Sequence, residues 1–323
     1  MKRILLARPR GYCAGVERAV ESVERALAQF GSPVYVRRQI VHNRHVVAEL
    51  EAKGAVFVED ENDVPPGGLV VFSAHGVAPH VHAEAVRRGL SVIDATCPLV
   101  AKVHQEARRF ARRDVTILLI GHAGHEEVVG TTGQAPERTI LVQTADEAAR
   151  VRVEDPERVA YLCQTTLSVD DTAEIVAILR RRFPAIQEPP TNDICYATQN
   201  RQEAVKALAR RADVVLVIGS ANSSNSNRLV EVARSTGIPA YLVDDERDID
   251  PAWLRDAETI GVTSGASAPE HVVERVVAFL GAGGPTAVEE LRVAQEHVVF
   301  SLPVPLRPVS TPEPASGAAL ESV

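Results

Sequence analysis

Four cysteines are the residues whose types and spacing point most directly to chemistry in this sequence. Cys13, Cys97 and Cys195 recur at similar intervals along the 323-residue chain, and each directly precedes a stretch with helical periodicity. A thiolate at the beginning of a helix is stabilised by backbone N–H groups and by the helix dipole. Three such thiolates that converged on one point could hold a metal, whereas three separate ones would be partly buried structural thiols.

The number of ligands distinguishes the metals that three cysteines could bind. Zinc would need a fourth protein ligand or a water. A [4Fe–4S] cluster usually has four cysteine ligands, so with three cysteines one iron would lack a thiolate and could bind a substrate. The remaining cysteine, Cys163, lies in an apolar run and precedes no helix, so we expect it to be a core residue.

Polar loops that follow predicted strands form a second set of candidates. Their side chains are mainly hydroxyls, amides and imidazoles, on His42, His45, His75, His122, His125, Gln164, Thr165, Thr166, Ser223, Ser224, Asn225, Asn227 and Ser267. Neutral donors of this kind can bind a phosphate or diphosphate, especially at a helix start. The alternative for any single residue is a cap or turn, and Asn225 and Ser226 could cap the helix that follows them.

The segment HAGHEE, residues 122–127, allows two kinds of chemistry. Its histidines and glutamates could join the cysteines as ligands of a zinc hydrolase, although the spacing is not the helical H-E-x-x-H pattern. A glutamate beside a buried anion would have a raised pKa and could deliver a proton near neutral pH. We expect one of Glu126 and Glu127 to be such an acid and the other to lie in a solvated turn.

The elements that must position these residues alternate between strands and helices. Short runs rich in Val, Ile and Leu predict buried strands at Ile4–Ala7, Val34–Arg37, Leu69–Ser73, Ser91–Asp94, Thr116–Ile120, Val159–Gln164, Asp213–Ile218, Ala240–Val243 and Thr259–Thr263. Amphipathic helical patterns follow the three cysteines. We predict an α/β fold of three similar lobes, residues 1–97, 98–194 and 195–281, whose loops meet in one crevice.

Residues 282–323 are expected to form a separate C-terminal segment. Its first part has the character of ordered structure, with His297–Ser301 as a candidate last strand. From about Pro303 the sequence is rich in Pro, Ser, Ala and Glu and lacks helical or strand periodicity. We expect this last part to be a mobile tail.

Composition and charge exclude two broad classes of partner. The formal net charge is −8, which is opposite to that of a general nucleic-acid binder. The apolar runs are far shorter than the ~20 residues of a membrane helix, and the N-terminus lacks the apolar stretch of a signal peptide. We therefore expect a cytoplasmic protein that binds neither nucleic acid nor membrane and has no disulfide framework.

Taken together, these motifs resemble those of the LytB-type 4-hydroxy-3-methylbut-2-enyl diphosphate reductases. The matching segments are RPRGYCAGVERAV, VHNRHV, FSAHGV, DATCPLV, IGHAGHEEV, QTTLSVDD, NDICYATQNRQEAV, GSANSSNSNR and GASAP, which extend from the N-terminus to about residue 281. No proposed site residue departs from the pattern. Glu126 stands where that pattern often has proline.

The resemblance implies three α/β lobes in a pseudo-threefold arrangement around a central [4Fe–4S] cluster. Cys13, Cys97 and Cys195 would ligate three irons and leave the fourth open to the substrate. The substrate and its diphosphate would be bound by His42, His75, His125, Ser223, Ser224, Asn225 and Ser267. Glu127 would supply a proton, and Thr165 would contact the substrate and help to position or relay that proton.

The implied reaction is the reductive dehydroxylation of 4-hydroxy-3-methylbut-2-enyl diphosphate to isopentenyl and dimethylallyl diphosphate, the last step of the non-mevalonate isoprenoid pathway. Its electrons would come singly from an external donor of the ferredoxin or flavodoxin type, and the resemblance suggests a monomer. From the residues alone two rivals stay open, namely the zinc hydrolase and a non-catalytic sensor of a phosphate-bearing ligand.

Overall fold

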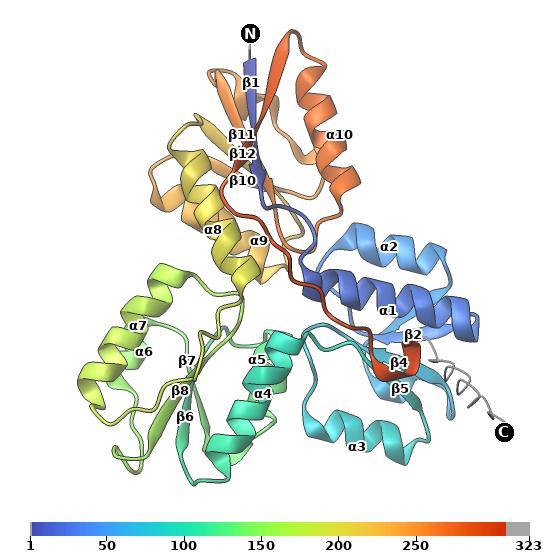
Figure 1. Cartoon of the computed structure of the whole chain (residues 1–323), viewed down its shortest axis with the longest axis vertical. Coiled ribbons are helices and arrows are strands. Elements are labelled where there is room, and N and C mark those ends of the chain that lie inside the picture. Colours follow the sequence, from blue (N-terminus) through green and yellow to red (C-terminus); the bar gives the residue numbers. More distant parts are fainter. Residues whose placement is uncertain (1, 308–323) are drawn as a thin grey trace, which may run out of the picture.

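The computed structural model describes residues 2–307, which fold into three lobes around a common centre (Figure 1). The strands are β1 (Lys2–Arg8), β2 (Val34–Arg37), β3 (Ala55–Val58), β4 (Leu69–Phe72), β5 (Ser91–Asp94), β6 (Thr116–Ile120), β7 (Thr139–Val142), β8 (Val159–Cys163), β9 (Val214–Ile218), β10 (Ala240–Val243), β11 (Thr259–Ser264) and β12 (Thr286–Arg292). The helices are α1 (Ala14–Phe30), α2 (Arg44–Ala52), α3 (Pro79–Arg87), α4 (Pro98–Ala111), α5 (Glu126–Thr132), α6 (Ala145–Arg150), α7 (Val169–Arg182), α8 (Tyr196–Ala209), α9 (Ser224–Ser235) and α10 (Glu270–Gly281).

Each lobe is built on one parallel sheet. The first lobe has the strand order β3-β2-β4-β5, the second β7-β6-β8, and the third β10-β9-β11-β1-β12. Helices α1–α3 belong to the first lobe, α4–α7 to the second and α8–α10 to the third (Figure 1). The predicted α/β fold of three lobes with parallel sheets is confirmed.

The helices that follow the three cysteines bury apolar faces against these sheets. Val16, Ala19 and Val23 of α1 pack with Val34 and Val71 of the first sheet, and all five are buried. The burial of one such side chain stabilises the fold by about 1.5–3 kcal/mol relative to its exposure, if it is of valine or leucine size. Packing of this kind fixes the first turn of each helix, where the cysteines stand.

The first strand departs from the predicted division of the chain. The predicted first lobe begins at residue 1, but β1 lies in the third lobe between β11 and β12. An apolar run indicates that a strand is buried, but it does not indicate which sheet contains it. As a result the chain crosses from the third lobe to the first between β1 and α1, at Cys13.

The C-terminal segment also differs from its prediction. The predicted strand at His297–Ser301 is wrong, and the last described strand is β12 instead. Much of β12 is exposed, so no buried apolar run marks it in the sequence. Beyond it, Val304–Leu306 form a single 3-10 turn, and Leu306 packs into the core of the first lobe. The rest of the predicted tail, residues 308–323, lies outside the described residues.

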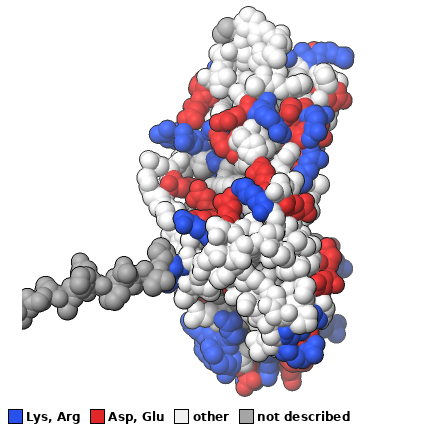
Figure 2. Space-filling view, turned by 90° about the vertical axis from the view of Figure 1, so that its right-hand side faces the viewer, with Lys and Arg blue, Asp and Glu red and all other residues white. Residues whose placement is uncertain are grey.

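Within residues 2–307, no helix combines the length and the apolar character required to cross a bilayer. Figure 2 shows acidic and basic side chains interspersed over the face in view.

Candidate active site

The three predicted ligand cysteines stand where the chain passes from one lobe to the next. Cys13 joins β1 of the third lobe to α1 of the first, and Cys97 joins β5 of the first lobe to α4 of the second. Cys195 precedes α8, the first helix of the third lobe. Each cysteine is the N-cap residue of the helix that follows it, as the sequence predicts. The first turns of these helices meet near the centre of Figure 1.

Equivalent backbone hydrogen bonds hold the three cysteines. The Cys13 N–H donates to the Ala266 carbonyl at 3.3 Å, and the Cys97 N–H donates to the Ala74 carbonyl at 2.9 Å. The Cys195 N–H donates to the Thr165 carbonyl at 3.1 Å. Each acceptor lies in a loop that follows a strand of the lobe that the chain is leaving. The same kind of backbone hydrogen bond, to the carbonyl of a loop residue, therefore anchors all three cysteines.

One pocket contains every residue that the family resemblance assigns to the site. Its lining includes Cys13, Cys97, Cys195, His42, His75, His125, Glu127, Thr165, Ser223, Ser224, Asn225 and Ser267. Around the cysteines the wall is apolar, with Val16, Val41 and Val100, and no described residue lining the pocket is a lysine or an arginine. The site thus has a sulfur end, formed by the three cysteines, and a polar end of neutral donors.

The spacing of the sulfurs bears on what they could hold. The three cysteine Sγ atoms do not all lie within 4.8 Å of one another. One ligand atom from each of His42, His75 and Glu126 does meet that criterion. Two sulfurs on one zinc ion cannot be more than about 4.6 Å apart, because each Zn–S bond is about 2.3 Å long. As placed, the three sulfurs are too far apart for one zinc ion, whereas three thiolates are the kind of donor that an iron–sulfur cluster takes.

Gly15 makes room for the sulfurs. A Cβ atom at this position would lie 2.7 Å from Cys97 Sγ and 3.8 Å from Cys13 Sγ. The first distance is shorter than carbon–sulfur packing allows, so any side chain here would displace the Cys97 sulfur. Gly15 is thus part of the sulfur end, although the sequence analysis did not single it out.

Burial disfavours the charged form of two of the thiols. It raises the pKa of the Cys97 thiol to about 12, with a further contribution from Cys13, and it raises the pKa of Cys195 to about 11. Thr198 opposes this effect at Cys195, because its N–H donates to Sγ at 3.4 Å and its hydroxyl lies 3.1 Å from the same atom. A bound cationic centre would reverse the preference and stabilise the thiolates.

The polar end is a network of hydroxyls and amides that joins the second and third lobes. Ser224 Oγ accepts hydrogen bonds from Gln164 Nε2 at 3.2 Å and from the Thr166 hydroxyl at 3.1 Å. Asn225 Oδ1 accepts the Ala266 N–H at 2.9 Å. The helix cap is Ser223, whose side chain accepts the Ser226 N–H. The alternative that Asn225 and Ser226 cap this helix is therefore wrong, since both lie within its first turn.

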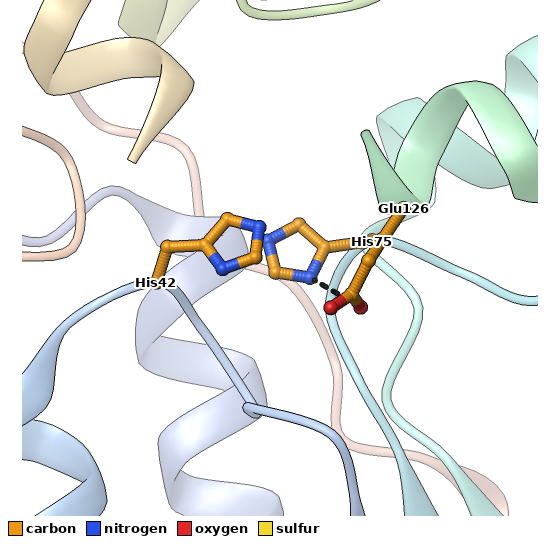
Figure 3. A group of neighbouring side chains, drawn as sticks. All are labelled: His42, His75 and Glu126. Carbon is orange, nitrogen blue, oxygen red and sulfur yellow. Dashed lines mark ion pairs between the residues drawn. The ribbon is translucent and has the colours of Figure 1, made fainter. Parts of the chain in front are cut away.

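Three histidines line the polar end, and two of them have strongly lowered pKa values. Burial and the nearby imidazoles lower the pKa of His42 to about 3 and that of His125 to about 4, so both rings are neutral near pH 7. The His42 and His75 rings stack with their centroids 4.0 Å apart (Figure 3). His125 Nδ1 accepts the Glu127 N–H at 3.2 Å, which leaves Nε2 as the ring donor of the neutral form.

Glu126 does not lie in a solvated turn. Its carboxylate is directed at His75, with Oε2 3.5 Å from Nδ1 (Figure 3). The other carboxylate oxygen, Oε1, lies 3.8 Å from Arg38 Nη1. Burial acts to raise the pKa of Glu126, but the hydrogen bond and charge of His75 outweigh it, and the pKa is lowered. Glu126 thus connects the second lobe to the first beside the pocket and remains a carboxylate.

Glu127 has the opposite environment, because it is almost completely buried. Its Oε1 accepts the Thr165 N–H at 2.6 Å, and its Oε2 accepts the Thr165 hydroxyl at 3.1 Å. Burial outweighs these hydrogen bonds and raises the pKa of Glu127 to about 7. A carboxyl group with such a pKa can give up a proton near neutral pH.

Several residues near the site are not among those that the family resemblance assigns to it. Thr166 and Thr198 line the pocket, and Thr198 follows Cys195 at the helical position that faces back to the cap residue. That cap-and-third-residue spacing is the signal that could have identified it.

His122 does not line the pocket, because its ring contacts the Arg228 guanidinium at 2.9 Å. Cys163 is buried in the core of the second lobe, as predicted.

Comparison with known proteins places the chain in a family. Residues 4–281 match the model of the LytB protein family. The chain is 63% identical to the 4-hydroxy-3-methylbut-2-enyl diphosphate reductase of Acidothermus cellulolyticus, over 95% of this chain and 90% of that protein. It is 62% identical to the corresponding reductase of Mycolicibacterium paratuberculosis, over 95% of this chain and 92% of that protein.

Two solved structures agree with this assignment. The E-1-hydroxy-2-methyl-but-2-enyl-4-diphosphate reductase of Plasmodium falciparum superposes with a TM-score of 0.91 at 39% identity, covering 94% of this chain and 96% of that chain. A second reductase, described as the terminal enzyme of the non-mevalonate pathway, superposes with a TM-score of 0.61 at 32% identity, covering 87% of this chain and 100% of that one. The chain therefore belongs to the LytB family of 4-hydroxy-3-methylbut-2-enyl diphosphate reductases.

Proposed function

We propose that this chain reduces 4-hydroxy-3-methylbut-2-enyl diphosphate to isopentenyl and dimethylallyl diphosphate with a [4Fe–4S] cluster held by Cys13, Cys97 and Cys195. The observation that carries the proposal is one pocket with three cysteines at one end and neutral phosphate-binding groups at the other. The three sulfurs are not grouped closely enough for one zinc ion, and family membership supports the same reaction.

The cluster would supply single electrons and, at the iron without a thiolate, a Lewis acid for the hydroxyl that leaves. The chain's own contribution at the sulfur end is to hold the ligands and to keep water out. The apolar wall of Val16, Val41 and Val100 serves the second purpose. A dry site also strengthens every polar interaction inside it.

At the polar end, the chain would bind the diphosphate with neutral donors. The hydroxyls of Ser223, Ser224 and Ser267, the amide of Asn225 and the imidazoles of His42, His75 and His125 are available there. Helix α9 begins at this end, and its first N–H groups and dipole favour an anion. Preorganised donors in a dry pocket bind an anion without a lysine or arginine, because they need not be reoriented when it enters.

Glu127 would donate the proton that the reaction consumes, and Thr165 would orient that carboxyl through its two hydrogen bonds. About half of the Glu127 carboxyl groups carry the proton at pH 7 and most carry it at lower pH, because burial raises the pKa to about 7. Glu126 is unsuited to this role, because its lowered pKa keeps it ionised. This assigns different chemical tasks to two neighbouring glutamates.

The electrons would come from an external donor of the ferredoxin or flavodoxin type. The reaction adds two electrons to the substrate, and a single cluster accepts one at a time, so the donor must act twice in each turnover. The zinc hydrolase is less well supported, because His122 faces away to Arg228 and the HAGHEE residues do not form one ligand set.

Turnover under anaerobic conditions tests the proposed function. Protein purified without oxygen is mixed with 4-hydroxy-3-methylbut-2-enyl diphosphate and a chemical one-electron reductant, and the products are separated and identified. The proposal predicts isopentenyl and dimethylallyl diphosphate, formed only when the reductant is present. Products of hydrolysis formed without reductant would favour the zinc alternative, and substrate binding without any product would favour a sensor.

A further inference from the structure

Each lobe is bracketed by two of the three cysteines. The first lobe lies between Cys13 and Cys97, and the second lies between Cys97 and Cys195. The third lies between Cys195 and, through β1, Cys13. The helix that enters each lobe begins at one cysteine, and the segment that leaves the lobe ends at the next. A contact between the entering helix and the leaving segment would therefore set the distance between two cysteines.

In the first lobe, Arg18 makes such a contact. It lies in the second turn of α1, the helix that begins after Cys13, and its Nη1 donates to the Thr96 carbonyl at 3.0 Å. Thr96 is the residue before Cys97. The Nε of the same guanidinium donates to the Ser301 carbonyl at 2.8 Å, in the C-terminal segment. Arg18 thus connects the helix of one cysteine to the backbone beside the next.

In the second lobe, Lys102 occupies the equivalent position. It lies in the second turn of α4, and its Nζ donates to the carbonyls of Thr191 at 2.8 Å and Asn192 at 3.4 Å. The same ammonium donates to Asp193 Oδ1 at 3.0 Å. These acceptors lie in the segment that leads to Cys195. The other Asp193 oxygen accepts the Cys163 N–H at 2.9 Å, which ties this segment to the core of the second lobe.

In the third lobe, Arg201 completes the pattern. It lies in the second turn of α8, and its Nη2 donates to the carbonyls of Gly11 at 2.7 Å and Tyr12 at 3.4 Å. Tyr12 is the residue before Cys13. The side chain has no exposed surface, and Glu296 of the C-terminal segment supplies its counter-charge at 3.0 Å.

We propose that Arg18, Lys102 and Arg201 form one set of positioning residues, which we call the cation ring, and that it fixes the three distances between the ligand cysteines. Three distances define a triangle, so the ring would hold all three sulfurs ready for one inorganic core. The inference rests on the proposed function, because it assumes that a cluster is bound there.

The physical basis is preorganisation. Hydrogen bonds from a charged donor are roughly twice as strong as neutral ones, and the acceptor carbonyls all lie in the short segments that lead to a cysteine, from Thr96 and Tyr12 directly before one to Thr191 further upstream. Ligands that are already in place lose less conformational entropy when the core binds, so the bound state is favoured. Without the ring, the same cysteines would be present, but the segments that carry them would be ordered only by the cluster itself.

The rival explanation is that each cation only satisfies a loop carbonyl and stabilises its own lobe. The two explanations differ in what a substitution changes. Loss of a ring member would weaken the grip on the cluster more than it weakens the protein without cluster. Loss of an ordinary loop contact would lower the stability of the cluster-free protein. Cluster retention would then fall only as much as that loss of stability accounts for.

Arg18→Met is the primary test, because Arg18 is not fully buried and has no buried acid that would lose its partner. Arg25→Met is the matched control, since Arg25 lies on the same helix and pairs with Glu21 one turn away on the surface. For each protein, the decay of cluster absorbance in excess iron chelator is followed without oxygen. The thermal unfolding midpoint of the cluster-free protein is measured alongside.

We expect Arg18→Met to lose its cluster about tenfold faster than the unsubstituted protein, which is the effect of one charged hydrogen bond. Arg25→Met should match the unsubstituted protein, and Arg18→Lys should recover most of the loss. Any fall in the unfolding midpoint of the cluster-free Arg18→Met protein, relative to Arg25→Met, should be too small to account for its faster loss of cluster. Lys102→Met should also lose its cluster faster, because it opens another side of the triangle.

Unchanged cluster loss in Arg18→Met, equal acceleration in Arg25→Met, or no recovery in Arg18→Lys would each overturn the cation ring. A fall in the cluster-free unfolding midpoint that matches the loss of retention would overturn it as well. An unsubstituted protein that binds no iron at all would instead overturn the proposed function, so the two failures are distinguishable.

Discussion

The two ends of the pocket are built in different ways. At the sulfur end, each cysteine is a helix N-cap held by its own backbone N–H on a neighbouring loop carbonyl. At the polar end, side chains hold one another, as Ser224, Gln164 and Thr166 do across two lobes. The sulfur end therefore depends on the path of the backbone, whereas the polar end depends on individual side chains.

This contrast predicts that substitutions at the two ends have separable effects. Changes at the sulfur end should alter cluster retention, and changes at the polar end should alter substrate affinity. Glu127 belongs to neither class. A residue that only delivers a proton affects turnover, but it affects neither cluster retention nor substrate affinity.

The largest effect on turnover is expected for Glu127→Gln. The substitution keeps the size of the side chain but removes the acid, so kcat should fall by at least about 100-fold, as for loss of a general acid. Iron content and substrate binding should stay near those of the unsubstituted protein. A variant that turns over normally, or one that loses its iron, would show that Glu127 is not the proton donor.

The pH dependence of the unsubstituted protein follows from the same group. The pKa of Glu127 is raised to about 7, so the carboxyl is protonated below that pH and loses its proton above it. An acid is needed, so kcat should be high on the acidic side and fall as the pH rises through about 7. A pH profile of kcat measures this, and Glu127→Gln should lack this decline. A kcat that increased through pH 7 would contradict the assignment.

Gly15→Ala is the corresponding change at the sulfur end. The new methyl group would lie 2.7 Å from Cys97 Sγ, so iron per chain should fall to about one tenth or less, by the steric cost of overpacking. Alanine favours a helix over glycine by about 1 kcal/mol, so the cluster-free protein should not unfold more easily.

Gly281→Ala is the matched control for that change, because this helical glycine has open space around its Cβ position. Iron analysis and thermal unfolding of both variants provide the measurement. Equal iron content in the two would contradict the claim that Gly15 makes room for the sulfurs.

Ser224→Ala is the test at the polar end. It removes a hydroxyl that lines the pocket and accepts hydrogen bonds from Gln164 and Thr166, so KM should rise about fivefold with iron content unchanged. Ser235→Ala, at the far end of the same helix, should leave KM as it is. If Ser224→Ala instead lowered iron content and kept KM, the separation of the two ends would fail.

The smallest effect is expected for Glu126→Gln. Its carboxylate lies 3.5 Å from His75 Nδ1 and helps to hold that imidazole in place at the polar end of the pocket. Because the pair is partly exposed to water, the change should raise KM only about twofold and leave kcat unchanged. Steady-state kinetics beside Glu127→Gln measure the contrast. A kcat loss as large as that of Glu127→Gln would reverse the roles of the two glutamates.

The sequence predicts those features of the molecule that depend only on residues close together in the chain. Apolar runs identify buried strands, and helical periodicity after Cys13, Cys97 and Cys195 identifies the helices that these residues cap. The polar residues after strand ends are correctly expected to meet, because parallel strands present their carboxyl ends at one edge. These signals need only neighbouring residues, so they can be read from one chain.

Long-range pairing could not be predicted in the same way. Strand β1 joins β11 and β12, which are more than 250 positions further along the chain, and no local pattern specifies that choice. The short strands β3 and β7 lie at sheet edges and were not predicted. The contact of Glu126 with His75 likewise depends on how two lobes pack. Each of these features is decided by tertiary packing.

Iron and acid-labile sulfide per chain, measured after anaerobic purification, test the central claim most directly. The account predicts about four of each, with a broad visible absorption, for the unsubstituted protein and for Cys163→Ser. It predicts a large loss of both in Cys13→Ser. A colourless protein that contains zinc, or a Cys163→Ser variant that loses iron as readily as Cys13→Ser, would contradict it.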